Sequence, residues 1–241
     1  DNSEKDGYRS DSLIMNYGYN FNENLRVESY LYHNDSFLEY DAVNNTRTDS
    51  NDVTDDQSTS YTGRLIYGSG NLKNTISYNN TYSLRNITGN SPNNYYGYRD
   101  AINLLSEYNF SLDNKIVFGV DNEFDAAELK DYYTDGKYSK SDEAIYSQYF
   151  DLQLRTGEKT YTTFGLRRDD HTTVGDYYTG RITAAYKFDS STKLRTNLGT
   201  SVRFPSLYTL HHGNVLTSKD IIKAETGKSI DIGIDKFFTN H

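Results

Sequence analysis

The sequence predicts an all-β fold, part of an antiparallel transmembrane β-barrel to which the chain contributes about 11 strands. Polar and apolar residues alternate with a period of two in segment after segment, which places the apolar side chains on one face of a strand. Each segment runs for about ten residues or more, whereas strands of soluble sandwiches usually have about five or six. A tilted strand needs about 9–11 residues to cross the hydrocarbon core of a membrane, so a barrel explains the length.

The alternation recurs along the whole chain, and in each segment a set of apolar residues shares one face. These sets are Leu13, Met15, Tyr17, Tyr19 and Phe21; Ile116, Phe118, Val120 and Phe124; Thr162, Phe164 and Leu166; Ile182, Ala184, Tyr186 and Phe188; Leu194, Leu198, Val202 and Phe204; and Ile230, Ile232 and Ile234. The residues between them are mainly polar or glycine. A closed barrel suits such strands because closure pairs every backbone group, which lipid requires.

The connections between these segments are of two kinds. Short turns are expected at 21–24, 68–71, 111–114, 157–158 and 189–192, and they alternate with long polar segments at 42–57, 87–96, 128–142, 170–176 and 205–225. Outer-membrane barrels have short turns on the periplasmic side and long loops outside, so the two kinds should lie at opposite ends of the strands.

The composition excludes several classes of protein. The 241 residues carry a net charge of −9, which argues against nucleic acid as a partner because phosphate binding needs clustered Lys and Arg. The absence of Cys removes disulfides and thiolate metal sites. The mean hydropathy is negative, as expected if half of each strand faces a water-filled interior.

Aromatic residues gather near several strand ends, among them Tyr17, Tyr19 and Phe21 beside one short turn, and Phe237 and Phe238. Two interpretations stand: an aromatic girdle at the membrane interface, or ordinary cross-strand packing. Their position on the outward face near turns favours the girdle.

The stretch GTSVRFPSLYTL contains Pro205, which marks the end of a strand because proline cannot donate to a ladder. Together with KAETGKSIDIGID it resembles a motif of the TonB-dependent outer-membrane receptor family, carried here by Gly199, Arg203, Pro205, Leu207 and Glu225. Ala224 stands where the family usually has Pro, and Thr226 where it often has Ser. The stretches LRRDDHTTVGDYYTGRITAAYKF, EKDGYRSDSL and LEYD make the resemblance closest to the cobalamin-transporting branch.

The resemblance implies a barrel of about 22 strands with a plug domain inside it. Residues 1–241 would form part of the C-terminal barrel domain, and the plug and the final strands would lie outside this chain. We expect such a piece not to fold alone, because two sheet edges would stay unpaired.

The implied location is the outer membrane of a Gram-negative cell, and the implied function is energy-coupled uptake of a scarce, bulky nutrient, either cobalamin or a ferric siderophore. The implied partners are membrane lipid, the plug, TonB acting through a missing N-terminal segment, and the cargo. No enzymatic activity is implied.

The polar face of the strands carries a regular series of charged residues that we expect to face the lumen. The series comprises Arg155, Arg167, Arg181, Arg195, Asp231 and Asp235, with Arg203 and Asp151 in the same pattern. These side chains would either pair with an acidic surface of the plug or solvate the lumen, and the residues alone do not decide between the two.

In the cobalamin-transporting branch, acidic loop residues bind calcium, which takes six to eight oxygen ligands. The matching positions here are Glu4, Asp6, Tyr40, Asp41 and Asp52. The alternative interpretation is a solvated acidic loop, because NNTRTDSNDVTDDQ is simply rich in Asp and Asn. Calcium is thus the one candidate cofactor, and the residues do not decide between it and the solvated loop.

Two further groups of residues invite a chemical role. His211 and His212 lack a third ligand at metal-binding spacing, and Asp169, Asp170 and His171 lack a nucleophile, so surface and structural roles are favoured for both groups. The rival functions are a passive porin or adhesin-like barrel, an outer-membrane hydrolase, and a soluble all-β binding module.

Overall fold

The structure is a computed structural model of the chain, and it describes residues 6–41, 52–89, 92–130, 139–211 and 222–238. These residues form eleven antiparallel strands and one short helix, so the predicted all-β class and strand number are confirmed. The strands are β1 (Tyr8–Asn20), β2 (Leu25–Tyr40), β3 (Asp52–Ser69), β4 (Leu72–Thr88), β5 (Asn93–Asn109), β6 (Lys115–Lys130), β7 (Ser139–Thr156), β8 (Thr160–His171), β9 (Gly175–Lys187), β10 (Thr192–Arg203) and β11 (Glu225–Lys236), and the helix is α1 (Leu207–His211).

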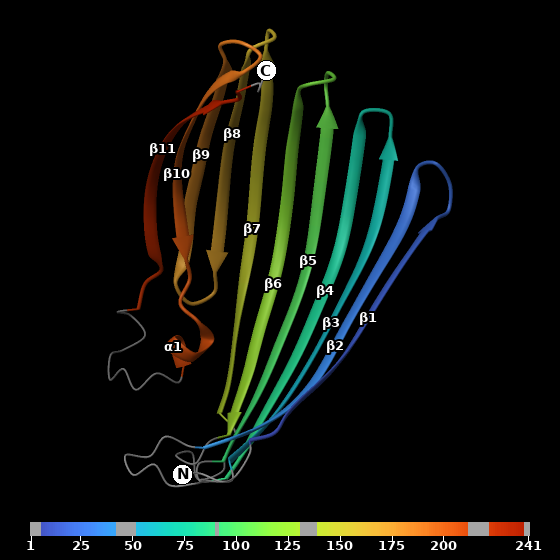
Figure 1. Cartoon of the computed structure of the whole chain (residues 1–241), viewed down its shortest axis with the longest axis vertical. Helices are drawn as coiled ribbons and strands as arrows, with labels where there is room; N and C mark the ends of the chain where they lie inside the picture. The colour runs from blue at the N-terminus through green and yellow to red at the C-terminus, as the bar shows by residue number, and fades with distance from the viewer. Residues whose placement is uncertain (1–5, 42–51, 90–91, 131–138, 212–221, 239–241) are drawn as a thin grey trace. The chain divides into compact units, whose positions relative to one another are not determined.

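The strands form one sheet in sequence order, so each strand from β2 to β10 pairs with the strands before and after it in the chain, while β1 pairs with β2 and β11 with β10 (Figure 1). The turns between β8 and β9 and between β9 and β10 set the register that brings Arg181 opposite Gly165 and Gly199. The five predicted short turns all separate consecutive strands.

Some of the segments predicted to be long loops are shorter in the structure, because the neighbouring strands extend into them. Segment 170–176 was expected to be a long loop, but β8 continues to His171 and β9 begins at Gly175, whose φ of 83° suits a tight turn. Likewise β3 already begins at Asp52, within the segment predicted as a loop. Hydrogen-bonded pairing continues here through residues that are polar on both faces, so the period-two signal fades before the strand ends.

Segment 205–225 was also expected to be a loop, and it contains α1. Ser206 precedes this helix, and its Oγ accepts a hydrogen bond from the Thr209 backbone N–H at 3.2 Å, as an N-cap residue does. Pro205 lies directly after β10, as its inability to donate predicts.

The chain divides into two compact units, which are described separately. The first contains Asp1–Leu65, Ser77–Ile102 and Glu123–Glu143, and the second contains Ile66–Ile76, Asn103–Asn122 and Ala144–His241. In the second unit, the predicted charged residues share one face. One row across the strands runs Arg155, Tyr161, Ala185, Arg195 and Gly233.

The opposite face of the second unit is apolar and exposed. Ile230, Ile232 and Ile234 of β11 are 67%, 73% and 70% exposed, and Leu166 of β8 is 69% exposed. Few apolar residues are buried among those that the structure describes: Ala101, Val117, Leu129 and Leu210. The apolar face therefore packs against no protein core, which is the arrangement expected of strands that face lipid.

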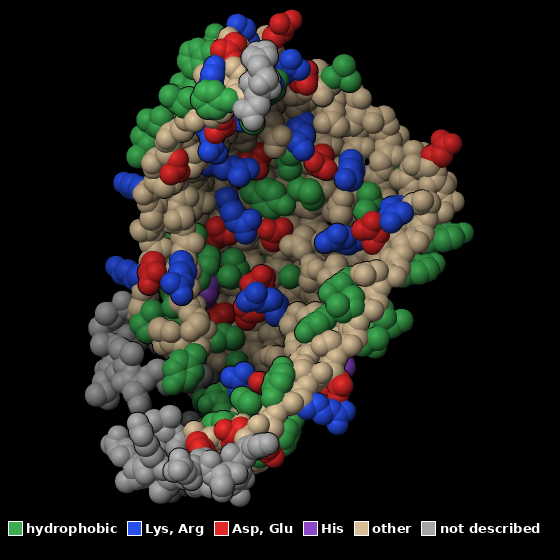
Figure 2. Space-filling model, viewed as in Figure 1, with side chains coloured by type: hydrophobic (Ala, Val, Ile, Leu, Met, Phe, Trp, Pro, Cys, Tyr) green, Lys and Arg blue, Asp and Glu red, His purple; other side chains and the backbone are tan. Residues whose placement is uncertain are grey.

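In Figure 2, Lys and Arg side chains lie next to Asp and Glu side chains over the visible face. Among the described residues, no helix is long and apolar enough to cross a membrane.

Candidate functional site: a charged sheet face

The charged face of the second unit is held by ion pairs that cross between strands. Arg167 of β8 donates from Nε to Asp169 at 2.8 Å and from Nη1 to Asp121 of β6 at 3.1 Å. Ser147 of β7 donates to the same Asp169 at 2.6 Å, and the Arg167 guanidinium lies 5.4 Å from the centre of the Tyr149 ring. One arginine thus holds two carboxylates, of which Asp169 is almost fully buried.

Arg181 of β9 reaches across β8 to Asp151 of β7, with Nη2 and Nε both close to Oδ1 at 3.0 and 3.2 Å. The residue between them in the register is Gly165. A Cβ at Gly165 would lie 2.4 Å from Asp151 Oδ1 and 2.9 Å from Arg181 Cγ. The ion pair can span two strands only because this position has no side chain.

Gly119 of β6 likewise leaves room for a neighbouring side chain, here the aromatic ring of Tyr149. A Cβ there would lie 2.0 Å from Cζ of Tyr149, so the Tyr149 ring occupies the space that a side chain at position 119 would fill. The glycine therefore positions the ring on which the Arg167 guanidinium stacks.

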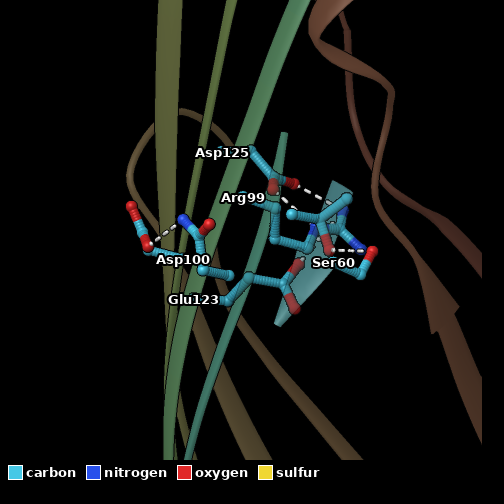
Figure 3. A network of polar contacts seen from close by, with 7 residues as sticks. Ser60, Arg99, Asp100, Glu123 and Asp125 are labelled. Carbon is cyan, nitrogen blue, oxygen red and sulfur yellow. Dashed lines mark hydrogen bonds and ion pairs between the residues drawn. The ribbon is translucent and has the colours of Figure 1, made fainter. Parts of the chain in front are cut away.

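The first unit has a corresponding pair on β5. Arg99 binds Asp125 of β6 through two hydrogen bonds of 2.6 Å each and lies 3.4 Å from Glu123. The next residue, Asp100, faces the other side of the strand and accepts hydrogen bonds from Tyr78 at 2.6 Å and Asn80 at 2.8 Å. Figure 3 shows Arg99 turned toward Asp125, with Asp100 on the other side of the strand.

The six predicted lumen-facing residues all lie on the charged face of the second unit, and each has a hydrogen-bond or ion-pair partner there. Arg155 donates to Asp113 at 2.8 Å, and Arg195 lies 3.3 Å from Asp235. Asp231 accepts a hydrogen bond from Asn197 at 3.1 Å. That the face lines a lumen stays a prediction.

The residues of the RFP motif have a structural role at the end of β10. Phe204 lies between two rings, 4.8 Å from His171 and 5.6 Å from Tyr177, and the Tyr177 hydroxyl accepts a hydrogen bond from the Ala224 backbone at 3.2 Å. Arg203 pairs with Glu225 in the register, and their side chains form an exposed ion pair of 3.8 Å. The motif thus anchors both ends of the 204–224 connection to β8 and β9.

Two other residues of the motif lie in or next to β10. Gly199 lies in β10 opposite Arg181 and Ser229, and Leu207 is the first residue of α1.

The buried His171 has structural contacts at the end of β8. Its Nδ1 accepts a hydrogen bond from the Thr173 backbone at 3.2 Å, which stabilises the β8–β9 turn. Asp169 is bound instead to Ser147 and Arg167, and Asp170 is paired with Arg168 at 3.2 Å. His212 lies outside the described residues, as does the side chain of His211.

The predicted calcium residues are distributed as follows. Glu4 lies outside the described residues, Asp6 precedes β1, Tyr40 ends β2, Asp41 follows it, and Asp52 begins β3 with a buried side chain against Gly89. Within the described residues, no three or more His, Cys, Asp or Glu form a group that could hold a metal ion. The described positions therefore do not by themselves fit a calcium site, and the calcium prediction remains a prediction.

Sequence reasoning missed Asp121, Gly165 and the Arg99–Asp125 pair, and it named Asp169 without its partners Ser147 and Arg167. The alternation of polar residues in 115–125 carried a signal for Asp121, which lies on the same face as Gly119 and Glu123. The glycine at 165 gave no signal, because its role depends on which residues the register places on either side of it.

The sequence matches a family model described as "TonB dependent receptor-like, beta-barrel" over residues 1–241. The chain belongs to the TonB-dependent receptor family. No curated protein matched the sequence.

Solved structures of this family have the same fold. The siderophore receptor PirA from Pseudomonas aeruginosa superposes with a TM-score of 0.76 at 16% identity, over 97% of this chain and 44% of its own. The ferripyoverdine receptor of the outer membrane of Pseudomonas aeruginosa gives 0.76 at 10% identity, over 95% and 39%. The alcaligin outer-membrane receptor FauA from Bordetella pertussis gives 0.75 at 12%, over 94% and 40%. The chain thus spans less than half the length of these TonB-dependent receptors.

Proposed function

We propose that this chain forms part of the barrel wall of an outer-membrane receptor that imports a scarce, bulky nutrient with energy supplied through TonB. The observation that carries the proposal is the family match over residues 1–241. The two-faced sheet supports it, because an exposed apolar face suits lipid and an ion-paired face suits a wet lumen.

The partners follow from this proposal. A plug domain would lie against the charged face, and TonB would pair with an N-terminal strand that precedes the plug, a strand-addition mode. Residues 1–241 would be one part of the barrel domain. The cargo would be a ferric siderophore or cobalamin, and the siderophore receptors among the similar structures favour the former.

Uptake in cells tests the function. A Gram-negative strain that lacks its own receptors would express the protein and receive radiolabelled ferric siderophores or cobalamin, with and without an uncoupler of the proton gradient. The proposal predicts accumulation of one of these cargoes that the uncoupler abolishes. Uptake of small solutes that the uncoupler leaves unchanged would show a passive porin, and surface adhesion without uptake would show an adhesin.

Calcium binding remains part of the proposal for the loops that contain Asp6, Asp41 and Asp52, which residues outside the described ranges would have to complete. Titration of the purified protein with Ca²⁺, followed by calorimetry, tests it. Saturable binding that Asp6→Asn weakens supports the site, and heat no larger than that of Mg²⁺ removes it.

A further inference from the structure

Asp100 of β5 is a carboxylate on the side of the sheet that Arg99 does not occupy. Side chains alternate along a strand, and Arg99 bonds to Asp125 on the other side. Asp100 therefore shares its face with Tyr98 and Ile102, which are 39% and 55% exposed. An ionisable side chain on a lipid-facing surface is costly and is usually retained for a function.

The protein holds this carboxylate in place but does not neutralise it. Tyr78 donates from its hydroxyl at 2.6 Å and Asn80 donates from Nδ2 at 2.8 Å, and both bonds reach Oδ1 of Asp100. Within the described ranges Asp100 forms no ion pair, whereas the adjacent Arg99 is paired with two carboxylates. Two neutral donors leave the negative charge in place, and Oδ2 can accept a hydrogen bond from another molecule.

Tyrosine rings lie beside the carboxylate. The rings of Tyr82 on β4 and Tyr98 on β5 are 5.2 Å apart, and Tyr78 is 41% exposed. We call Tyr78, Asn80, Tyr82, Tyr98 and Asp100 the tyrosine–aspartate cluster. The face of a Tyr ring attracts an organic cation, and a carboxylate accepts charge-assisted hydrogen bonds from an ammonium group. The cluster therefore fits a cationic amine better than a calcium ion, which needs six to eight oxygen ligands.

The cluster lies at a particular depth along the strand. β5 begins at Asn93, after a predicted long loop, and ends at Asn109, before a predicted short turn. The stretch from Asp100 to Asn109 is about as long as the roughly 9–11 residues with which a tilted strand crosses the hydrocarbon core. In a membrane, Asp100 would then lie at the level of the lipid headgroups on the long-loop side.

We propose that the tyrosine–aspartate cluster binds a lipid whose headgroup carries a primary ammonium group, with the ammonium on Asp100. The inference rests on the proposed function, which places this face in the membrane. A lipid headgroup presents an ammonium beside a phosphate, whereas a lysine of a partner protein presents the ammonium alone. The hydroxyls of Tyr82 and Tyr98 donate no hydrogen bond to any residue that the structure describes, so they can donate to that phosphate. A lipid is therefore favoured over a protein partner.

Glu128 of β6 provides an internal comparison. It lies on the same face as Asp100, because Asp125 of its own strand contacts Arg99 on the other face and side chains alternate. Glu128 accepts a hydrogen bond of 2.6 Å from Lys140, so its charge is neutralised within the protein. The two carboxylates should therefore differ in lipid binding.

Native mass spectrometry of the complete receptor tests the proposal. The receptor is folded into vesicles of equal parts phosphatidylethanolamine and phosphatidylcholine with the same acyl chains, released in mild detergent, and weighed with the lipid that it retains. Phosphatidylethanolamine has a primary ammonium that can donate to Asp100, whereas the quaternary ammonium of phosphatidylcholine has no N–H donor. We expect the receptor to retain phosphatidylethanolamine in preference to phosphatidylcholine.

Three variants complete the test. Asp100→Asn keeps the shape of the side chain and should reduce retention of phosphatidylethanolamine about tenfold, because a charge-assisted hydrogen bond is lost. Asp100→Glu keeps the charge and should keep the preference, and Glu128→Gln should leave it unchanged. Equal retention of the two lipids, or an equal loss in Asp100→Asn and Glu128→Gln, overturns the proposal. So does a bound protein, in place of lipid, that Asp100→Asn releases.

The uptake experiment is scored separately. Energy-dependent uptake by a receptor that shows no lipid preference would refute the lipid site and leave the transport function intact. A lipid preference that depends on Asp100, without energy-dependent uptake, would refute the function and leave the site.

Discussion

Replacing Gly165 by Ala provides a sharp test of how the charged face is held together. The added Cβ would lie 2.4 Å from Asp151 Oδ1 and 2.9 Å from Arg181 Cγ, so the ion pair between these residues would have to separate. Overpacking of this kind costs about 1–3 kcal/mol. Alanine in a strand is favoured over glycine by about 0.5–1 kcal/mol, which offsets part of the cost. We expect a net destabilisation of about 1 kcal/mol, the middle of the range of about 0–2.5 kcal/mol that these two values leave.

The sign should reverse when the obstacle is removed. In a variant that already carries Asp151→Ala and Arg181→Ala, the Cβ meets neither side chain, and Gly165→Ala should stabilise by about 0.5–1 kcal/mol. Equilibrium unfolding in urea of the complete receptor, folded into lipid vesicles, measures all four free energies. An equal effect of Gly165→Ala in both backgrounds would refute the reasoning, because the glycine would then matter for its backbone alone.

Three further predictions follow from single features. Ile230→Arg should destabilise the protein in lipid vesicles by about 2–4 kcal/mol, whereas Ser229→Arg on the opposite face should cost much less, and equal costs in urea unfolding would argue against the two-faced sheet. Hydrogen bonds from the Ser191 side chain and backbone lower the pKa of Asp189 to about 2. The ionised Asp189 carboxylate therefore stabilises the turn at pH values above the ordinary pKa of Asp, and this stabilisation is lost as the pH falls through about 2. Ser191→Ala should move that pKa upward in a carboxyl NMR titration, and an unmoved pKa would exclude this cause. Phe204→Ala should lower the free energy of unfolding by about 2 kcal/mol in the same assay, because it removes the contacts of Phe204 with the His171 and Tyr177 rings. An unchanged free energy would show that the motif does not act through these contacts.

The alternation of polar and apolar residues was sufficient to predict the fold class, because it can be recognised within each segment without knowledge of the other strands. The ends of the strands were not predictable in the same way. Around Asp52 and Asp170 both faces are polar, so the alternation disappears while backbone pairing continues. Strand length in this region is decided by hydrogen bonding to the neighbouring strand, and the hydropathy of one segment does not reveal that pairing.

The charged face shows a similar limit. Local alternation predicted that Arg167 and Arg181 share a face, and the register places them there. Their partners could not be predicted, because Asp151 and Asp121 come from other strands and reach the arginines only in one register. The Pro205 motif was recognised as a strand end, but its contact with His171 and Tyr177 required knowing which turn lies beside it.

The sequence-ordered sheet has a consequence for how such a protein can change over time. Because strands pair only with their neighbours in the chain, each hydrogen-bonded ladder closes a short stretch of chain. Lengthening a connection at the long-loop end raises the closure entropy of that one hairpin only slowly and shifts no other register. The long connections can therefore change in length and sequence during evolution while the strands keep the same pairing.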